Sequence, residues 1–154
     1  MVASQQDEFI RELTRQVGLL AEELRNANRI QLHRLFAEQM DRAIDDPSFA
    51  DVLGVPGGVS PDKRRQLAFA NKHYVLILVR YRTGDIDRAE LLGHLKYLSR
   101  SPVFAEYWQR TSEGRSSLPK ESLEARIGRA IDAVMDERLD DLEEWWVTGS
   151  EPEM

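Results

Sequence analysis

The sequence predicts an all-α protein, a helical bundle of about five to six helices with a long N-terminal helix. From about Gln5 to Ile44 the chain contains no proline and a single glycine, and good helix formers dominate. Helix start signals recur further along the chain. No segment sustains the alternation of polar and apolar residues that is typical of strands, so we expect no sheet.

A chain of 154 residues fits a single folded unit by length. We expect three parts: a heptad-like helical extension over residues 1–28, a helical domain over 29–147 and a C-terminal tail over 148–154. Apolar residues make up 42% of the chain, which is enough to build a core without disulfides or a structural metal.

Composition also narrows the environment and the partners. Cysteine is absent, which favours a reducing compartment, and hence the cytoplasm, and removes every cysteine-based reaction or metal site. The net charge of −6 argues against nucleic-acid binding. We expect no signal peptide and no membrane association, because the longest apolar run, Tyr74 to Val79, is far shorter than the ~20 residues of a transmembrane helix.

Helix boundaries can be placed from local signals. Ser4 followed by Asp7 resembles a capping pair, and Asp45-Asp46-Pro47 should end the first helix. Ser60-Pro61-Asp62 predicts the start of a second long helix, which should end at Gly84. The remaining elements are expected in this order: a short helix over 48–53, a helix from Asp85 or Asp87 to Ser99, one from Ser101-Pro102 to Arg110, a polar loop over 112–119 and a last major helix over 121–138.

The first helix carries two different apolar stripes. Alternating spacings of three and four residues define a heptad seam made of Ile10, Leu13, Val17, Leu20, Leu24 and Ala27. A second stripe with the period of a globular helix follows it: Leu32, Leu35, Phe36, Met40, Ala43 and Ile44. We expect this second stripe to pack into the domain.

The first helix is also too long for the domain. About 40 helical residues extend for about 60 Å, whereas a compact chain of this size is about 40 Å across. Part of the helix should therefore overhang, and an exposed apolar seam needs cover. We expect the seam to form the interface of an isologous homodimer. The alternative is that Gly18 breaks the helix and both halves fold back on the same chain.

The helix beginning at Ser60 should be central. Besides a core-facing set that includes Leu67, Tyr74 and Ile77, it places Phe69 and Leu76 on other sides. A helix that is apolar nearly all round is usually buried on all sides. Further core residues are expected from the later helices: Leu91, Leu92, Leu95, Leu98, Phe104, Tyr107, Trp108, Ile127, Ala130, Ile131, Val134 and Met135.

Side chains that could carry chemistry are few and scattered. No two of the histidines, His33, His73 and His94, are neighbours in sequence, and Glu90 with His94 lacks the i, i+3 repeat of di-iron bundles. We therefore expect no metal and no cofactor. Asn71 and His73 interrupt the apolar central helix, so hydrogen bonds or a ligand should satisfy them. Any ligand pocket is expected near His33, Asn71, His73 and Tyr74, although structural hydrogen bonding is the simpler interpretation.

Known catalytic signatures are missing. The chain contains no Gly-x-Ser-x-Gly, no phosphate loop and no dinucleotide fingerprint. Its carboxylate pairs fall at predicted helix ends and in the tail, where carboxylates are usually solvated. Trp145-Trp146 is unusual, because exposed tryptophans are enriched at interfaces. This pair either docks onto its own domain or binds a partner.

Several segments resemble a known family. They are Leu32-His33-Arg34-Leu35-Phe36, Asp45-Asp46-Pro47, Phe69-Ala70-Asn71 with Tyr74, and Val103 to Trp108. Together they resemble an actinobacterial family of small helical proteins catalogued as a domain of unknown function, over about Ala27 to Trp146. Many members carry membrane-spanning helices before this domain, whereas the first thirty residues here are polar and heptad-like. The resemblance implies no activity, so it transfers no catalytic residue.

These observations favour a non-enzymatic, homodimeric helical interaction or regulatory module that binds a protein or peptide. One alternative is a small-ligand-binding protein with a pocket between the first and central helices. Another is an acid–base enzyme, which would need a histidine within hydrogen-bonding reach of a carboxylate in a cleft.

Overall fold

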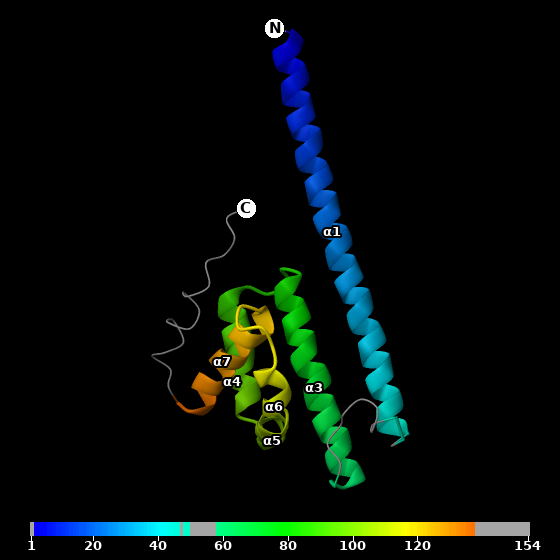
Figure 1. Cartoon of the computed structure of the whole chain (residues 1–154), viewed down its shortest axis with the longest axis vertical. Helices are drawn as coiled ribbons and strands as arrows, with labels where there is room; N and C mark the ends of the chain where they lie inside the picture. Colours follow the sequence, from blue (N-terminus) through cyan, green and yellow to red (C-terminus); the bar gives the residue numbers. More distant parts are fainter. Residues whose placement is uncertain (1, 47, 50–57, 138–154) are drawn as a thin grey trace.

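The computed structural model describes residues 2–46, 48–49 and 58–137, and all regular secondary structure in these ranges is helical, which confirms the all-α prediction (Figure 1). The helices are α1 (Val2–Asp45), α3 (Pro61–Arg82), α4 (Arg88–Ser99), α5 (Pro102–Arg110), α6 (Ser112–Ser116) and α7 (Leu123–Met135). Most of the predicted helix over 48–53 lies outside the described residues.

The first helix is unbroken over 44 residues, about 66 Å at 1.5 Å per residue. Gly18 does not interrupt it, so the predicted overhang is confirmed and the alternative of a broken helix is wrong. The N-terminal half of α1 extends well beyond the other helices in Figure 1. Ser4 does not cap the helix, which already begins at Val2, whereas the predicted end at Asp45 is confirmed.

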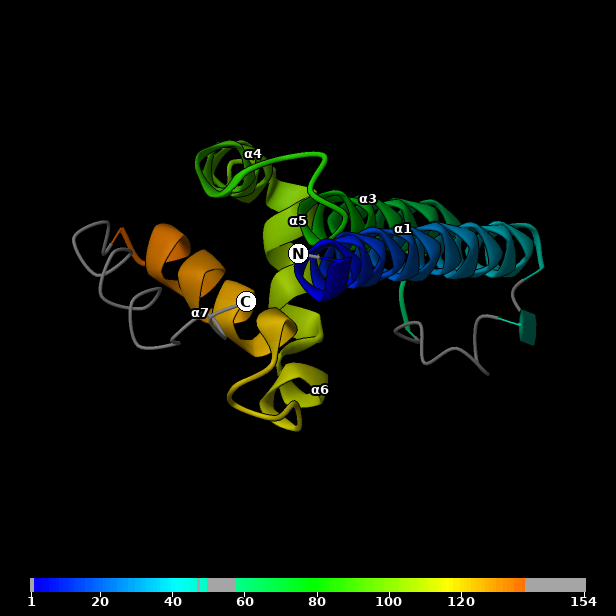
Figure 2. The ribbon, with the colours of Figure 1, turned by 90° about the horizontal axis from the view of Figure 1, so that it is seen from above.

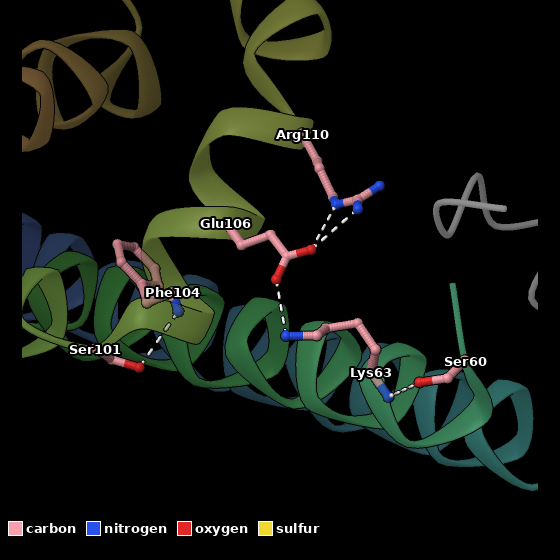
Figure 3. A network of polar contacts seen from close by, with 6 residues as sticks. All are labelled: Ser60, Lys63, Ser101, Phe104, Glu106 and Arg110. Carbon is pink, nitrogen blue, oxygen red and sulfur yellow. Dashed lines mark hydrogen bonds and ion pairs between the residues drawn. The ribbon is translucent and has the colours of Figure 1, made fainter. Parts of the chain in front are cut away.

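Side-chain caps determine where the later helices begin. In four helices the residue before the first turn accepts a hydrogen bond from the backbone N–H three residues on: Ser60 from Lys63, Asp87 from Glu90, Ser101 from Phe104 and Ser122 from Ala125. Such caps satisfy backbone donors that have no partner inside the helix. The caps at Ser60 and Ser101 appear in Figure 3. Because Ser122 is a cap, α7 begins at Leu123 and not at the predicted residue 121.

Helix α3 ends at a glycine, as the sequence predicts. Gly84 has a φ of 77°, in the left-handed region that favours glycine. Its N–H donates to the carbonyl of Tyr81, and the N–H of Asp85 donates to the carbonyl of Arg80 at 2.9 Å. This pair of bonds is a Schellman motif, which satisfies carbonyl groups at the end of a helix. The motif reverses the chain toward α4.

Replacing Gly84 with alanine is expected to lower the free energy of unfolding by about 1 kcal/mol, because an L-residue is strained at this φ. Gly93, inside α4, is the matched control, since a Cβ there meets nothing within 4 Å. Gly93→Ala should raise stability by about 0.5–1 kcal/mol through better helix propensity. Urea unfolding followed by circular dichroism measures both changes. Equal effects of the two substitutions would contradict the role of Gly84.

The core lies between α3 and the four shorter helices α4 to α7. In Figure 1, α3 lies between α1 and these helices, and Figure 2 shows α1 and α3 running alongside each other, with α4 to α7 to one side. Helix α3 contacts α1, α4 and α5, so it is the central element. The buried cluster comprises Leu67, Ala70, Tyr74, Ile77, Leu78, Ile86, Leu91, Leu95, Phe104, Tyr107, Trp108, Ile127 and Ile131. Its centre is aromatic: the ring of Tyr74 lies 5.4 Å from that of Trp108, and the ring of Phe104 lies 5.7 Å from Trp108.

An ion-pair network links α3 to α5 at the surface (Figure 3). The Lys63 ammonium lies 2.9 Å from one carboxylate oxygen of Glu106, and Arg110 lies 3.0 Å from the other. The hydrogen bonds from Lys63 and then Arg110 lower the pKa of Glu106. Because these groups are partly solvated, the network orients α5 on α3 more than it stabilises the fold.

Two sequence expectations about packing are wrong. Leu32 and Leu35 of the second stripe are 65% and 46% exposed, and only Met40 and Ala43 of that stripe are fully buried. The main contact of α1 is with α3 alone, and a single neighbouring helix covers only a narrow strip. Phe69 and Leu76 of α3 are also exposed, because α3 keeps one side facing solvent between its two sets of neighbours.

The predicted polar loop over 112–119 contains the short helix α6. Arg115, in α6, donates hydrogen bonds to Thr111 and to the carbonyl of Trp108, and its guanidinium lies 3.5 Å from the centre of the Trp108 ring. These contacts hold α6 on the end of α5. A five-residue helix with a glycine inside it has little intrinsic stability, so periodicity alone does not predict it.

Candidate functional site

The seam on the overhanging half of α1 is the most prominent apolar surface that the structure describes. Its five large side chains, Ile10, Leu13, Val17, Leu20 and Leu24, are each between 47% and 66% exposed, and Ala27 is exposed as well. Apolar side chains gathered on one exposed face indicate an interaction surface. The structure therefore places the predicted seam residues together on one helix, and no other described part of the chain covers them.

The seam points away from the bundle. A residue advances about 100° around a helix axis, so Leu13, Leu20 and Leu24 lie roughly 160–180° from Met40. Met40 is buried and lies where α1 contacts α3, as does Asp41, whose carboxylate pairs with Lys72 of α3 at 2.6 Å. A second molecule can therefore reach the seam without displacing α3.

Several polar side chains on this half of α1 find their partners within α1 itself. Arg15 donates two hydrogen bonds to the carboxylate of Glu12, at 2.9 and 2.7 Å, and Gln16 donates a third at 2.8 Å. These hydrogen bonds lower the pKa of Glu12 to about 2, and the largest contribution comes from Arg15. The Thr14 hydroxyl donates to the carbonyl of Ile10. Glu12 and Arg15 thus pair away from the seam and do not interrupt it.

The four residues predicted to line a pocket have separate environments. The Asn71 side chain accepts a hydrogen bond of 2.8 Å from the Tyr107 hydroxyl, which satisfies it structurally. His73 is exposed and stacks on Phe69 with ring centres 6.3 Å apart. His33, on α1, lies edge-on to Phe36, and its Nε2 atom is buried without a hydrogen-bond partner among the described residues.

The fourth residue, Tyr74, lines an open cavity that has no α1 residue in its lining. The cavity has a volume of about 360 Å³ and is lined by residues of α3, α5, α6 and α7. Its walls are mostly apolar, with Leu78, Val79 and Leu118, while Arg115 and the Arg82–Glu124 ion pair supply charge. Sequence reasoning missed this cavity because its lining combines α3 with the later helices α5, α6 and α7, and spacing along the chain does not show how they pack.

Burial changes the titration of two tyrosines beside the cavity. It raises the pKa of Tyr107 to about 12 and also raises the pKa of Tyr74. In the unfolded chain both would ionise near pH 10. The stability that depends on the neutral phenols is therefore complete below pH 10 and is lost as the pH rises from about 10 to 12.

For Tyr107 alone this loss amounts to about 2 kcal/mol by pH 12. Urea unfolding at pH 8, 10 and 11 should show it, and Tyr74→Phe should make the decline above pH 10 less steep. A free energy of unfolding that stays constant from pH 8 to pH 11 would contradict this expectation.

A partly buried polar cluster joins α5, α6 and α7. The Trp108 indole N–H donates to the Asp132 carboxylate at 2.7 Å, and the Arg115 guanidinium lies over the Trp108 ring. Burial lowers the pKa of Arg115, and Asp132 partly offsets that effect. A buried indole N–H needs a hydrogen-bond acceptor, so the sequence predicts that Trp108 has one. Nothing in the sequence identifies Asp132 as that acceptor. The cluster positions helices.

The histidines and carboxylates of the described residues are not grouped as acid–base or metal chemistry would require. Over these residues, no carboxylate pairs with or hydrogen-bonds to His33, His73 or His94. Nor do three histidine or carboxylate groups there gather as they would around a metal ion. The contact that an acid–base enzyme would require is thus missing from this part of the chain.

Two further expectations concern the C-terminal segment and membrane-spanning helices. Trp145 and Trp146 lie outside the described residues, as does the predicted tail over 148–154. Among the helices that the structure describes, none is both long enough and apolar enough to span a membrane.

Comparison with known proteins identifies the family. No curated protein and no solved structure matches the chain. The sequence profile of one family matches residues 2–149, which is nearly the whole length and includes both α1 and the bundle. The overhanging helix is therefore part of what that profile describes. The chain belongs to this family, a family of unknown function, DUF6082.

Proposed function

We propose that the protein is a homodimeric helical interaction module whose two copies pair through the seam of α1. The observation that carries the proposal is the position of the seam: it lies on the overhanging half of α1, on the side opposite the contact with α3. An apolar stripe on a long rigid helix has the geometry of a coiled-coil partner. Pairing would cover side chains that are otherwise left in water.

The size of the seam sets the strength of association that we expect. Complete burial of one large aliphatic side chain contributes about 1.5–3 kcal/mol, and the seam offers five per chain, none of which becomes completely buried in a two-stranded coil. Association must also overcome the entropy lost when two chains combine. A dissociation constant in the micromolar range, about −8 kcal/mol, is therefore reasonable.

We further propose that this module acts in the cytoplasm without catalysis and binds a protein or peptide besides itself. The absence of cysteine supports a reducing compartment, and the net charge of −6 argues against nucleic acid as the partner. Exposed Phe69 and Leu76 on α3 offer a second apolar surface for such a partner. An actinobacterial origin, and membrane anchors in other members, remain predictions of the family resemblance.

Hydrogen–deuterium exchange at several protein concentrations tests self-association. The backbone amides of residues 10–27 should exchange more slowly at 100 µM than at 1 µM, because pairing suppresses helix opening. Amides of α3 are the internal control and should not change with concentration. Exchange over residues 10–27 that is fast and independent of concentration would contradict the proposal.

The 360 Å³ cavity favours small-ligand binding as a second candidate function. Its apolar walls, with Arg115 at one side, suit a small aromatic carboxylate, for which benzoate is a simple probe. Millimolar benzoate should raise the melting temperature of the whole protein, and Leu118→Trp, which narrows the cavity, should remove the rise. No rise with the unmodified protein would remove this candidate.

A further inference from the structure

The residue types in the seam indicate how two copies are oriented, an inference that rests on the self-association proposed above. In heptad notation the first position is called a and the fourth d. The spacing places Ile10, Val17 and Leu24 at a, and Leu13, Leu20 and Ala27 at d. Two of the three a residues are β-branched, and two of the three d residues are leucine. β-Branched residues at a with leucine at d favour a parallel two-stranded coil.

We propose that two chains pair through the seam in parallel and in register, so that each seam residue lies opposite its own copy. In this arrangement the a layers hold Ile10 and Val17 in the geometry where β-branched side chains pack well in dimers. An antiparallel pair would instead set each a residue against a d residue, with Ile10 opposite the partner's Ala27. The distribution of β-branched residues and leucines then loses its packing advantage.

The flanking positions are compatible with the parallel register. Residues at heptad position g approach the partner's next position e, which gives three pairs along the seam: Phe9 with the partner's Thr14, Gln16 with the partner's Ala21 and Glu23 with the partner's Asn28. None of these pairs brings like charges together. One heptad further on, the same rule sets Ile30 against the partner's Leu35, and both side chains are exposed in the single chain.

The seam also has a defined end. The a and d positions after Ala27 hold Gln31 and Arg34, and Arg34 pairs with Glu38 of its own helix at 3.1 Å. Close packing of the two copies should therefore stop near Leu35. Beyond that point α3 covers α1 on the side away from the partner (Figure 1). The parallel dimer thus carries both bundles at one end, on opposite outer sides of the paired helices.

Single-cysteine variants of the full chain test this orientation, because the natural sequence contains no cysteine. In the parallel register, Ala27→Cys places two thiols face to face, and mild oxidation should link most of the protein as a disulfide dimer. In the antiparallel register centred on the seam, the same thiols would lie about 26 Å apart. Glu22→Cys, on the outer side of α1, is the matched control and should cross-link far more slowly.

A mixture of Ile10→Cys and Ala27→Cys chains makes the two registers distinguishable by peptide mass spectrometry. We expect disulfides between identical positions only. Disulfides between position 10 of one chain and position 27 of the other, in a protein that sediments as a dimer, would overturn the parallel orientation and leave the proposed self-association standing. A monomer that forms neither link would overturn both.

Discussion

Replacing Leu20 with glutamate is expected to weaken self-association at least about 100-fold. Each dimer would lose two leucines from the seam, at about 1.5–3 kcal/mol for each side chain fully buried, and would gain two charges that need water. Glutamate is a good helix former, so α1 should stay helical. Sedimentation velocity between 1 and 200 µM measures the change in dissociation constant, and circular dichroism checks the helix content.

Leu19→Glu is the matched control for this substitution. Leu19 is the adjacent leucine, is 46% exposed and lies off the seam. The two variants carry the same change in charge and in helix propensity, so a difference between them reports position alone. We expect Leu19→Glu to associate like the unmodified chain. Equal weakening by both substitutions would show that general hydrophobicity of α1, and not the seam, drives association.

Phe104→Ala is expected to cause the largest loss of folding stability, about 3–5 kcal/mol. Phe104 is 1% exposed and packs against the rings of Tyr74, Tyr107 and Trp108, so its removal leaves a cavity at the aromatic centre of the core. Urea unfolding gives the free energy, and a Leu20→Glu background removes any contribution from association.

Phe69→Ala provides the control for that measurement. The Phe69 ring is 64% exposed and stacks only on His73. Its removal should change stability by no more than about 0.5 kcal/mol. Comparable losses at both positions would mean that Phe69 is covered in solution, for example by a partner chain on the exposed side of α3.

The start or end of several helices could be predicted, because short-range chemistry determines these boundaries. Ser60 and Ser101 cap the helices predicted from them, and Gly84 ends α3 in a left-handed conformation. The heptad spacing likewise identifies the seam residues from the sequence alone. These signals involve residues within one or two turns of each other, so a single sequence carries them.

Packing between helices was less predictable. Periodicity shows that Leu32, Leu35 and Met40 are apolar residues of one helix segment, but not that a single neighbour would cover only the side holding Met40. The cavity beside Tyr74 combines α3 with α5, α6 and α7, and the bond from Trp108 to Asp132 joins residues 24 positions apart. Such contacts depend on the arrangement of helices in space, which spacing along one chain does not determine.

Sedimentation equilibrium of the unmodified chain tests most directly whether two seams pair. The expected mass is twice the 17.7 kDa of one chain at high micromolar concentration, falling toward 17.7 kDa on dilution. The Leu20→Glu variant should remain at 17.7 kDa over a much wider range of concentrations. A mass of 17.7 kDa for the unmodified chain throughout the micromolar range would contradict self-association through the seam.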